Sequence, residues 1–508
     1  MAPISTSREG FHYKNDQVNE GLYTEAAISS SKSLKQHYDV IIIGGGFTGL
    51  TAARDLSTAG KSVLIVEARD RIGGRTWATK SRGHYMEMGG TWVYWTQPHV
   101  WSELKRYGLD RELKQTTGTS PDLEALHFKA RDTDPLKRYT FDGPGGYNEI
   151  METTIYKFLN VDGAGGTKIL ARPYDADFVR KTPLKYLKIT CKDRLDQLAD
   201  VPQEHKDLVA SMFETIGCAP IGVTPFYEIL RWFGLSGFTF RGFLESVDAL
   251  SLKRGTTSLA LAIMSESKAD ILLSSPVASV VRSKTENITT ITTRDSKTFR
   301  TPKVICTLPV NCLGDVTFDP PIHPHKLAAA KEQHLTKIVK MHTYTPKTLV
   351  PTFTATLAPS KIAFGYTESD IHPTPTSNES GTFSVFFGSE PHLDRSSPLA
   401  TFRQFKKILP EEFKNEERNG RFEAEEMFWH DWTNDEFAKG AWCTFPMGWQ
   451  ENYLDALRAD EHGGSCIFAN ADWADGWRGF IDGAFEIGRA SAWRILKVDR
   501  DQNRTSKL

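Results

Sequence analysis

Residues 38–49 are Tyr38-Asp39-Val40-Ile41-Ile42-Ile43-Gly44-Gly45-Gly46-Phe47-Thr48-Gly49, and they decide the fold of this chain of 508 residues. The β-branched apolar run before the glycines is typical of a strand that is buried on both faces. The stretch Leu50–Ala59 has helical composition and stops before Gly60. A second apolar strand, Lys61–Val66, follows and ends at Glu67. The order of strand, glycine turn, helix and strand predicts a βαβ unit of an α/β fold.

Each part of this unit suits one part of a dinucleotide. Gly44, Gly46 and Gly49 form a G-x-G-x-x-G pattern, which permits a tight turn and close approach of the backbone to a pyrophosphate. Thr48 lies in the same turn, where the start of the helix supplies N–H donors. The Glu67 carboxylate ends the second strand and can accept hydrogen bonds from ribose hydroxyls. The unit therefore predicts a Rossmann-type dinucleotide-binding domain.

The composition excludes several other classes of protein. Hydrophobic residues make up 39% and charged residues 25% of the chain, as in soluble globular proteins. Lys and Arg total 62 against 63 for Asp and Glu, so no basic excess indicates nucleic acid. The six scattered cysteines form no C-x-x-C pair, no H-E-x-x-H is present, and no run of 18 apolar residues occurs. We therefore expect a soluble, intracellular, multidomain protein with no metal site, no nucleic-acid partner and no membrane span.

The two ends of the chain predict where the protein works. The first 36 residues are polar and Ser-rich without a secretory signal, which predicts an arm lying over the surface or disordered. The chain ends in Ser506-Lys507-Leu508, a peroxisomal address that an import receptor binds. The alternative is a chance tripeptide on a polar tail. Because the match is complete and follows a charged segment, we expect a peroxisomal protein.

The stretch after the second strand identifies the dinucleotide by resemblance. Residues 67–76 are Glu67-Ala68-Arg69-Asp70-Arg71-Ile72-Gly73-Gly74-Arg75-Thr76, and they resemble the FAD-dependent amine oxidase family, which carries E-A-x-x-R-x-G-G-R there. The family's Gly-Gly pair near the flavin ring is matched by Met88-Gly89-Gly90-Thr91-Trp92. Because nicotinamide enzymes have no counterpart to either block, FAD is favoured over NAD. The resemblance implies these cofactor contacts: Glu67, Ala68, Arg69, Gly74, Arg75 at the pyrophosphate, Gly90, Thr91 and Trp92.

The resemblance continues along the chain. Ser275–Val281 is similar to the family strand that borders the adenine at Val277, and Val304–Pro309 is similar to the strand that returns to the FAD domain. Ile467–Asp472 is a strand followed by an acid, and Gly476–Ala484 opens a helix that we expect to run to about Val498. The family places the start of this helix at the pyrimidine end of the flavin. The implied contacts here are Asp472, where the family commonly has glutamate, Gly479, Phe480 and Ile481.

Within the family, the chain most resembles the monoamine oxidases, especially the soluble fungal kind. Two aromatic rings flank the amine in those enzymes, and the matching residues are Trp442 and Phe480. Two ring faces form an apolar slot that disfavours a hydrated ammonium, although either ring alone is equally typical of an ordinary core. Mammalian members attach the flavin to a cysteine at the position of Ala441, so we expect non-covalent FAD. Cys443 is two positions further on and is expected to be displaced from the flavin.

A lysine and a further tryptophan complete the predicted site. Lys340 lies in Lys337–Thr343, whose alternation of apolar and polar residues predicts a strand. The family holds a water beside flavin N5 with such a lysine, and Lys337 is a competing assignment. Trp432 matches a tryptophan that packs on the flavin edge, with Trp429 as the alternative. The catalytic residues predicted from the resemblance are thus Lys340, Trp442 and Phe480, and the last two also bind substrate.

The motifs lie in separated parts of the chain, which predicts a discontinuous organisation of mixed α/β class. The Rossmann-type FAD-binding domain, of the glutathione-reductase-like kind, is expected to comprise residues 37–118, 250–325 and 437–498. A substrate domain of mixed sheet and helices is expected from residues 119–249 and 326–436. Residues 1–36 form the arm, and 499–508 form the tail with the targeting signal.

The resemblance implies oxidation of a neutral primary or secondary amine. A hydride from the amine Cα would pass to the flavin, water would hydrolyse the imine to an aldehyde or ketone, and dioxygen would be reduced to hydrogen peroxide. An L-amino acid oxidase is an alternative that needs an arginine for the substrate carboxylate, and a polyamine oxidase needs acidic residues in its tunnel. A non-catalytic flavoprotein or a chromatin-binding demethylase relative is a third alternative. The preferred amine and the oligomeric state are left open.

Overall fold

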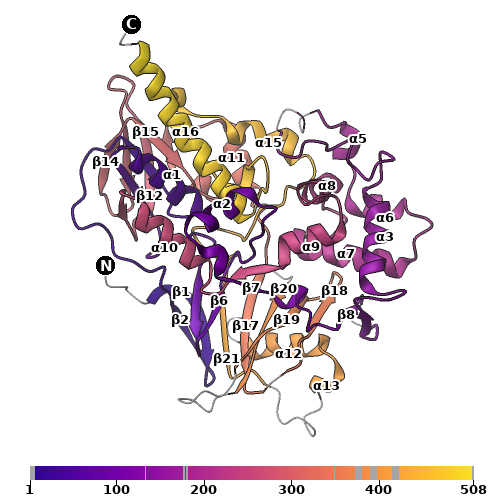
Figure 1. Cartoon of the computed structure of the whole chain (residues 1–508). Helices are drawn as coiled ribbons and strands as arrows, with labels where there is room; N and C mark the ends of the chain where they lie inside the picture. Colours follow the sequence, from indigo (N-terminus) through magenta and orange to yellow (C-terminus); the bar gives the residue numbers. More distant parts are fainter. Residues whose placement is uncertain are drawn as a thin grey trace.

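Two large sheets of different kinds organise the chain in the computed structural model (Figure 1). One sheet has five strands and the other has nine, and helices surround both. The described residues are 6–131, 133–175, 178, 181–347, 349–371, 380–388, 397–414 and 423–505. This mixed α/β architecture confirms the predicted fold class.

The five-stranded sheet carries the predicted βαβ unit. All its neighbouring strands run parallel, and β3 pairs with β4 and β15. Every residue of β3 and β4 is buried, as the apolar runs predict for a sheet covered on both faces. In sheet order the strands are β11 (Asp270–Leu272), β4 (Val63–Val66), β3 (Val40–Ile43), β15 (Lys303–Cys306) and β22 (Cys466–Phe468). The strands come from all three segments expected to form the FAD-binding domain.

Helices α1 and α16 pack against each other beside this sheet (Figure 1). Helix α1 ends before Gly60, whose φ of 91° is the left-handed conformation that glycine adopts most easily. The helices of this region are α1 (Phe47–Thr58), α2 (Pro98–Arg106), α10 (Thr256–Glu266), α11 (Pro324–Lys331), α15 (Trp449–Arg458) and α16 (Ile481–Thr505). Helix α1 begins directly after Gly46, and α16 begins two residues after Gly479, so both follow a glycine-containing turn.

Three smaller sheets flank the parallel one. The predicted strand at Val277 is found as β12, which pairs with β13 and β16. The four-stranded sheet has the order β14 (Thr298–Thr301), β13 (Thr289–Thr293), β12 (Val277–Arg282) and β16 (Thr317–Asp319). Two-stranded sheets join β10 (Leu250–Leu252) to β7 (Leu113–Gln115), and β5 (Ala78–Ser81) to β6 (His84–Glu87).

The nine-stranded sheet brings the N-terminal segment together with the region 326–436. Its neighbours are antiparallel except for β8 beside β18. The predicted strand around Lys340 is confirmed as β17. The order is β2 (Gln17–Tyr23), β1 (Thr6–Lys14), β21 (Glu426–His430), β17 (Val339–Thr345), β20 (Gly381–Gly388), β19 (Ile362–Ile371), β18 (Phe353–Thr356), β8 (Ala125–Lys129) and β9 (Lys137–Thr140).

Residues 6–23, predicted to lie over the surface or to be disordered, are ordered at the edge of the nine-stranded sheet. These residues form the hairpin β1–β2, and β1 pairs with β21. The Phe11 ring stacks on Trp429 with centroids 5.4 Å apart, and Leu22 is buried. The Ser-rich segment that follows bonds to the edge strand β11, since Ser31 N donates to Ile271 O and Ser31 Oγ accepts from Ile271 N. Partners far along the chain thus order a segment whose own composition is polar.

Helices of the region 119–249 form a layer that lies to the right in Figure 1. The helices are α3 (Tyr147–Leu159), α5 (Leu184–Leu187), α6 (Cys191–Asp196), α7 (Gln203–Gly217), α8 (Phe226–Leu235) and α9 (Phe240–Asp248). Two further helices, α12 (Pro398–Ile408) and α13 (Glu411–Lys414), lie at the nine-stranded sheet.

The C-terminal helix is longer than predicted. Helix α16 continues to Thr505, so the expected tail at 499–508 is helical over its first seven residues. The reason is local, because no Gly or Pro interrupts the segment. Ser506-Lys507-Leu508 lies outside the described residues. None of the described helices carries an apolar run long enough to cross a membrane.

Candidate active site

A cavity of about 360 Å³ extends from the carboxyl ends of the parallel strands to one face of the nine-stranded sheet. It gathers residues from all the predicted motifs, although Gly49 and Asp472 do not line it. The predicted residues in its wall are Gly44, Gly46, Thr48, Glu67, Ala68, Arg69, Gly74, Arg75, Gly90, Thr91, Trp92, Val277, Lys340, Trp432, Trp442, Gly479, Phe480 and Ile481. Their roles toward cofactor and substrate stay predictions.

The glycine turn at the start of α1 is shaped for a close backbone approach. A Cβ on Gly49 would lie 2.0 Å from Gly44 O, so this glycine packs the helix on the strand and does not face the cavity. A Cβ on Gly74, whose φ is +61°, would lie 3.1 Å from Gly46 Cα. Gly46 caps α1 without a side-chain hydrogen bond. The helix start therefore keeps N–H donors for an anion, and the turn fits a pyrophosphate.

Glu67 occupies the place expected for a ribose contact. Its two oxygens accept from Gly45 N at 2.5 Å and Arg69 N at 2.8 Å. Burial raises the pKa of Glu67, while the nearby Arg69 guanidinium and these N–H groups oppose the shift. Because a carboxylate offers about four acceptor sites, it keeps capacity for ribose hydroxyls. The residues present here fit an FAD adenosine and pyrophosphate.

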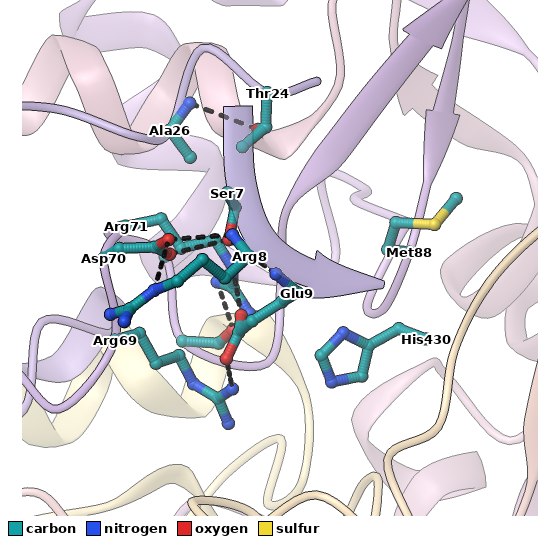
Figure 2. A network of polar contacts seen from close by, with 12 residues as sticks. Ser7, Arg8, Glu9, Thr24, Ala26, Arg69, Asp70, Arg71, Met88 and His430 are labelled. Carbon is teal, nitrogen blue, oxygen red and sulfur yellow. Dashed lines mark hydrogen bonds and ion pairs between the residues drawn. The ribbon is translucent and has the colours of Figure 1, made fainter. Parts of the chain in front are cut away.

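Arg69 joins three distant segments in a buried network, and Figure 2 shows its contact with Glu9. Its guanidinium pairs with Asp435, at 2.6 and 2.8 Å, and with Glu9 of β1. Glu9 also pairs with Arg71 Nε at 2.6 Å. Burial acts to raise the pKa of Glu9, but the charges of Arg71 and Arg69 lower it to about 2. Arg69 lines the cavity, yet two carboxylates already occupy its guanidinium, so it supports the loop more than it offers charge to a phosphate.

A second contact holds the same loop to β1. Ser7 Oγ donates to Asp70 Oδ1 at 2.6 Å, and Arg8 N donates to Asp70 Oδ2 at 2.8 Å (Figure 2). Strand β1 therefore makes ion pairs or hydrogen bonds with three consecutive residues, 69–71, of the loop that leads to Arg75.

Arg75 is held from behind by Asp472. Its guanidinium donates to Asp472 Oδ1 at 2.7 Å, Asn470 Oδ1 at 3.0 Å and Ala441 O at 2.8 Å. Asp472 is fully buried outside the cavity wall, and its other oxygen accepts from Val310 N. Asp472 therefore does not line the cavity, its carboxylate is engaged by Arg75, and its role toward the cofactor stays a prediction.

Lys340 lies on β17 and points into the cavity wall. Its Nζ donates to Thr91 Oγ1 at 2.6 Å and lies 3.4 Å from Gly89 O. Burial lowers the pKa of Lys340 to about 8, although Glu368 and Glu87 act in the opposite direction. Lys337 is exposed, so the structure places Lys340, and not its competitor, at the site.

Of the two tryptophans near the end of β21, one lines the cavity and the other lies in a separate hydrophobic cluster. Trp432 lines the cavity, and its Nε1 donates to Met88 O at 2.7 Å. Trp429 is fully buried in a separate hydrophobic cluster with Met341 and Phe386. Trp432 is therefore the one that can meet a cofactor.

Trp442 and Phe480 both line the cavity, as predicted for the aromatic pair. Trp442 Nε1 donates to Ile216 O at 2.9 Å, which fixes the indole. Phe480 meets the rings of Trp477 and Trp232 edge to face, with centroids 5.0 and 6.0 Å apart. Both rings are thus fixed by neighbouring residues.

Cys443 turns away from the cavity. Its Sγ lies 3.2 Å from His334 Nε2 and 3.4 Å from Asp472 O. Burial raises the pKa of this thiol well above its ordinary value. All six cysteines of the chain are free thiols. Within the described residues, no group of three or more His, Cys, Asp or Glu side chains could hold a metal ion.

The sequence did not identify the outer walls of the cavity. They are apolar and aromatic, and they come from α3, α7, α9 and the strands β8, β18, β19 and β20. On β8 and β18 the lining residues are two apart, as expected for one face of a strand. These side chains are Leu126, Phe128, Tyr147, Leu208, Met212, Ile216, Leu244, Val247, Phe353, Phe364 and Phe387. No local signal distinguishes them from ordinary core residues.

The charged residues of the wall are unevenly distributed. Among the described residues the lining arginines are Arg69, Arg75 and Arg294, and all three belong to the segments expected to bind FAD. The part of the wall built from 119–249 and 326–436 has Lys340, Asp248 and Glu436 as its charged groups. A substrate carboxylate therefore meets no arginine from the predicted substrate domain.

Comparisons with known proteins agree with this geometry. Residues 47–496 match the model of the family described as flavin containing amine oxidoreductase. The chain is 31% identical to a pseudooxynicotine dehydrogenase of Pseudomonas sp over 479 residues, covering 92% of this chain and 88% of the relative. It is 27% identical to a nicotine dehydrogenase of Pseudomonas putida over 467 residues, covering 91% and 89%. A solved putrescine oxidase with putrescine bound shares the fold with a TM-score of 0.70 at 21% identity, covering 91% of this chain and 99% of that one.

The family match covers most of the chain and includes helix α1, the loop at 67–76, β17 and the start of α16. These are the same elements that meet at the cavity. The chain belongs to the flavin-containing amine oxidoreductase family, whose members are enzymes that oxidise amines with a flavin.

Proposed function

We propose that the protein oxidises free primary or secondary amines that carry an apolar substituent. In this proposal FAD is bound without a covalent bond, and dioxygen is reduced to hydrogen peroxide. When bound, the flavin accepts the two electrons of the amine and passes them on. The protein binds and orients the amine, excludes water and controls the protonation of the groups around it.

The observation that carries the proposal is the apolar, aromatic wall beside Lys340, Trp442 and Phe480. An ammonium loses its hydration in such a wall, so the free base is the form that enters. An apolar substituent gains about 0.8 kcal/mol for each buried CH₂. A carboxylate without a cationic partner is strongly disfavoured there, which argues against an amino acid oxidase.

The proposed residue roles follow from their positions. Trp442 and Phe480 flank the amine, and the Lys340 ammonium with Thr91 holds a water close to the reacting end. Glu67, Arg75 and the start of α1 hold the adenosine and pyrophosphate of FAD. The flavin is not covalently attached, since Ala441 stands where mammalian relatives have a cysteine and the Cys443 thiol faces His334.

We also propose that the protein works in peroxisomes, through binding of Ser506-Lys507-Leu508 to the import receptor. The support is the sequence of the terminus together with the chemistry, because a peroxide-forming reaction suits a compartment that destroys peroxide. A fluorescent protein fused to the N-terminus, with and without the last three residues, tests this by microscopy. Peroxisomal signal that survives the deletion would contradict the proposal.

The decisive experiment is a substrate panel with the purified holoprotein. Alkyl and arylalkyl primary and secondary amines are compared with the corresponding α-amino acids in a peroxide assay. A parallel arm replaces dioxygen with an artificial electron acceptor, because two relatives are named as dehydrogenases. We expect amines to exceed amino acids by orders of magnitude in kcat/KM. Faster turnover of phenylalanine than of its decarboxylated amine would replace this proposal with an amino acid oxidase.

The pH dependence provides a second check on the same proposal. If only the free base enters the apolar wall, kcat/KM rises with pH toward the pKa of the substrate amine. Two substrates whose amine pKa values differ by two or more units should give profiles displaced by about that amount. Identical profiles would show that the ammonium form is the one bound.

A further inference from the structure

Asp248 is an acid in an otherwise apolar part of the cavity wall. It is the last residue of α9, and Leu244 and Val247 of the same helix line the cavity beside it. The rest of the wall from α7, β8 and β18 is chiefly apolar. An acid at this position therefore faces the space that we assign to the substrate.

The other acids of the cavity wall have partners. Glu67 accepts from two backbone N–H groups, Asp315 pairs with Lys439 at 2.6 Å, and Glu436 pairs with Arg294. Asp248 has no ion pair with any residue in the described part of the chain. Among the described acids of the wall, Asp248 is thus the one whose carboxylate has neither an ion pair nor a backbone N–H donor.

The surroundings of Asp248 do not favour a negative charge. The carboxylate lies directly over Gly118, where a Cβ would be 1.7 Å from Oδ2. The Thr116 hydroxyl donates to the backbone carbonyl of Asp248. The residue also ends a helix, where the backbone dipole is negative. Burial raises the pKa of Asp248 to about 7, with the Thr116 side chain opposing the shift.

We propose that Asp248 binds a second basic nitrogen of the substrate, so that the preferred amines are dibasic. The inference rests on the proposed amine oxidation and names its substrate class. A protonated nitrogen donates a hydrogen bond to the Asp248 carboxylate. It also supplies the positive charge that no side chain of the described residues supplies to Asp248 in an ion pair. If the second nitrogen belongs to an aromatic ring, one proton lies in the hydrogen bond between the ring nitrogen and the Asp248 carboxyl group. The chemistry common to both is one proton held between Asp248 and a nitrogen.

The test uses matched pairs of substrates with the holoenzyme. An alkylamine is compared with the α,ω-diamine of equal chain length, and a phenylalkylamine with the pyridylalkylamine of equal length. We expect the dibasic member of at least one pair to have about tenfold higher kcat/KM or more, which corresponds to roughly 1.4 kcal/mol. A preference in the first pair identifies an aliphatic diamine, and a preference in the second an aromatic base.

Two variants locate the preference. Asp248→Asn keeps the shape of the side chain and removes the charge, so the ratio within each pair should fall toward one. Glu245→Gln, on the same helix but outside the cavity wall, should keep the wild-type ratio. FAD content and the thermal unfolding midpoint are measured for both variants to confirm folding.

A further measurement needs no variant. Pyridine-containing compounds without an oxidisable amine should inhibit the wild-type enzyme more strongly than their benzene counterparts if ring nitrogens bind Asp248. Equal kcat/KM within both substrate pairs, or a preference that persists in Asp248→Asn, overturns the assignment of Asp248. Failure to oxidise any amine overturns the proposed function instead, so the two outcomes are distinguishable.

Discussion

At the scale of single residues, Lys340 shows how burial changes the chemistry of a side chain. Its ammonium lies inside the protein, where its hydrogen-bond partner is the Thr91 hydroxyl. Burial lowers the pKa of Lys340 to about 8. Between about pH 8 and its ordinary value near 10.5, the unfolded chain therefore holds a proton that the folded chain has released.

This difference predicts a pH effect on stability. The free energy of unfolding should rise with pH in that window for the wild type relative to Lys340→Met, by up to about 3 kcal/mol. Urea unfolding of both proteins at several pH values measures the difference. Lys337→Met, which removes an exposed lysine three positions earlier, should follow the wild type. A constant difference between wild type and Lys340→Met would contradict the lowered pKa.

Trp442 carries a second prediction at this scale. Replacing Trp442 with Ala removes one ring of the aromatic pair and the hydrogen bond to Ile216 O. The value of kcat/KM should fall about tenfold or more for small amines, and less for bulky amines that fill the vacated space. Steady-state kinetics on a series of amines of increasing size measures this. Trp493→Ala removes an exposed tryptophan of α16 and should leave the series unchanged.

At the scale of elements, β1 connects the nine-stranded sheet to the loop that follows β4. Glu9 on β1 neutralises Arg69 and Arg71, and Asp435 completes the network from the segment after β21. Asp435 also accepts from His430, whose ring contacts Trp432 with centroids 3.8 Å apart and planes tilted by 31°. The position of the loop at 67–76 therefore depends on the hairpin β1–β2 near the N-terminus.

Glu9→Gln tests this connection. Leaving the buried Arg71 guanidinium without its carboxylate, and Arg69 with Asp435 alone, should destabilise the protein by about 3–5 kcal/mol, and FAD should be lost more readily. Glu20→Gln, an exposed change on β2, is the matched control. Chemical unfolding and FAD retention on a desalting column measure the two effects.

The contribution of the Glu9 ion pairs to the free energy of unfolding should depend on pH. The pKa of Glu9 is about 2 in the folded protein against an ordinary 4.5, so its contribution is complete above pH 4.5 and is lost as the pH falls toward 2. The stability difference between wild type and Glu9→Gln should therefore narrow over that range. A difference that stays constant down to pH 2 would show that the ion pairs do not account for it.

At the scale of the whole molecule, the cavity joins segments that are far apart in the chain. Its wall takes residues from the glycine turn, the helical layer, the nine-stranded sheet and the start of α16. The residues predicted to hold FAD come from the glycine turn, the loop at 67–76 and the start of α16, so FAD would join distant segments. Because a ligand that binds only the folded state stabilises it, FAD should raise the stability by about 2.7 kcal/mol at a concentration 100 times its Kd.

Because the proposed binding is non-covalent, FAD can be removed and its effect on stability can be measured directly. Acid or heat denaturation followed by ultrafiltration should release all the flavin, and the FAD-depleted protein should unfold at a lower temperature that FAD restores. Flavin that stays with the precipitated chain would contradict the proposal and point to Cys443, despite the position of its thiol beside His334.

The sequence by itself determined the elements whose conformation is encoded locally. The parallel strands, the glycine turn, helix α1 and the strand of Lys340 follow from apolar runs, alternation and glycine spacing, which act over a few residues. Gly44, Gly46, Thr48, Gly49 and Lys340 lie in these elements, and all of them except Gly49 line the cavity.

Only the tertiary structure decided the features that depend on partners far along the chain. The polar segment 6–23 became a hairpin because β21 offered it an edge, and Asp472 turned to Arg75 because that guanidinium was within reach. The apolar walls and Asp248 carry no local signal, since a side chain that faces a cavity has the same sequence neighbours as one that faces the core or solvent. Their roles depend on which distant residues fold against them, and that is decided by packing of the whole chain.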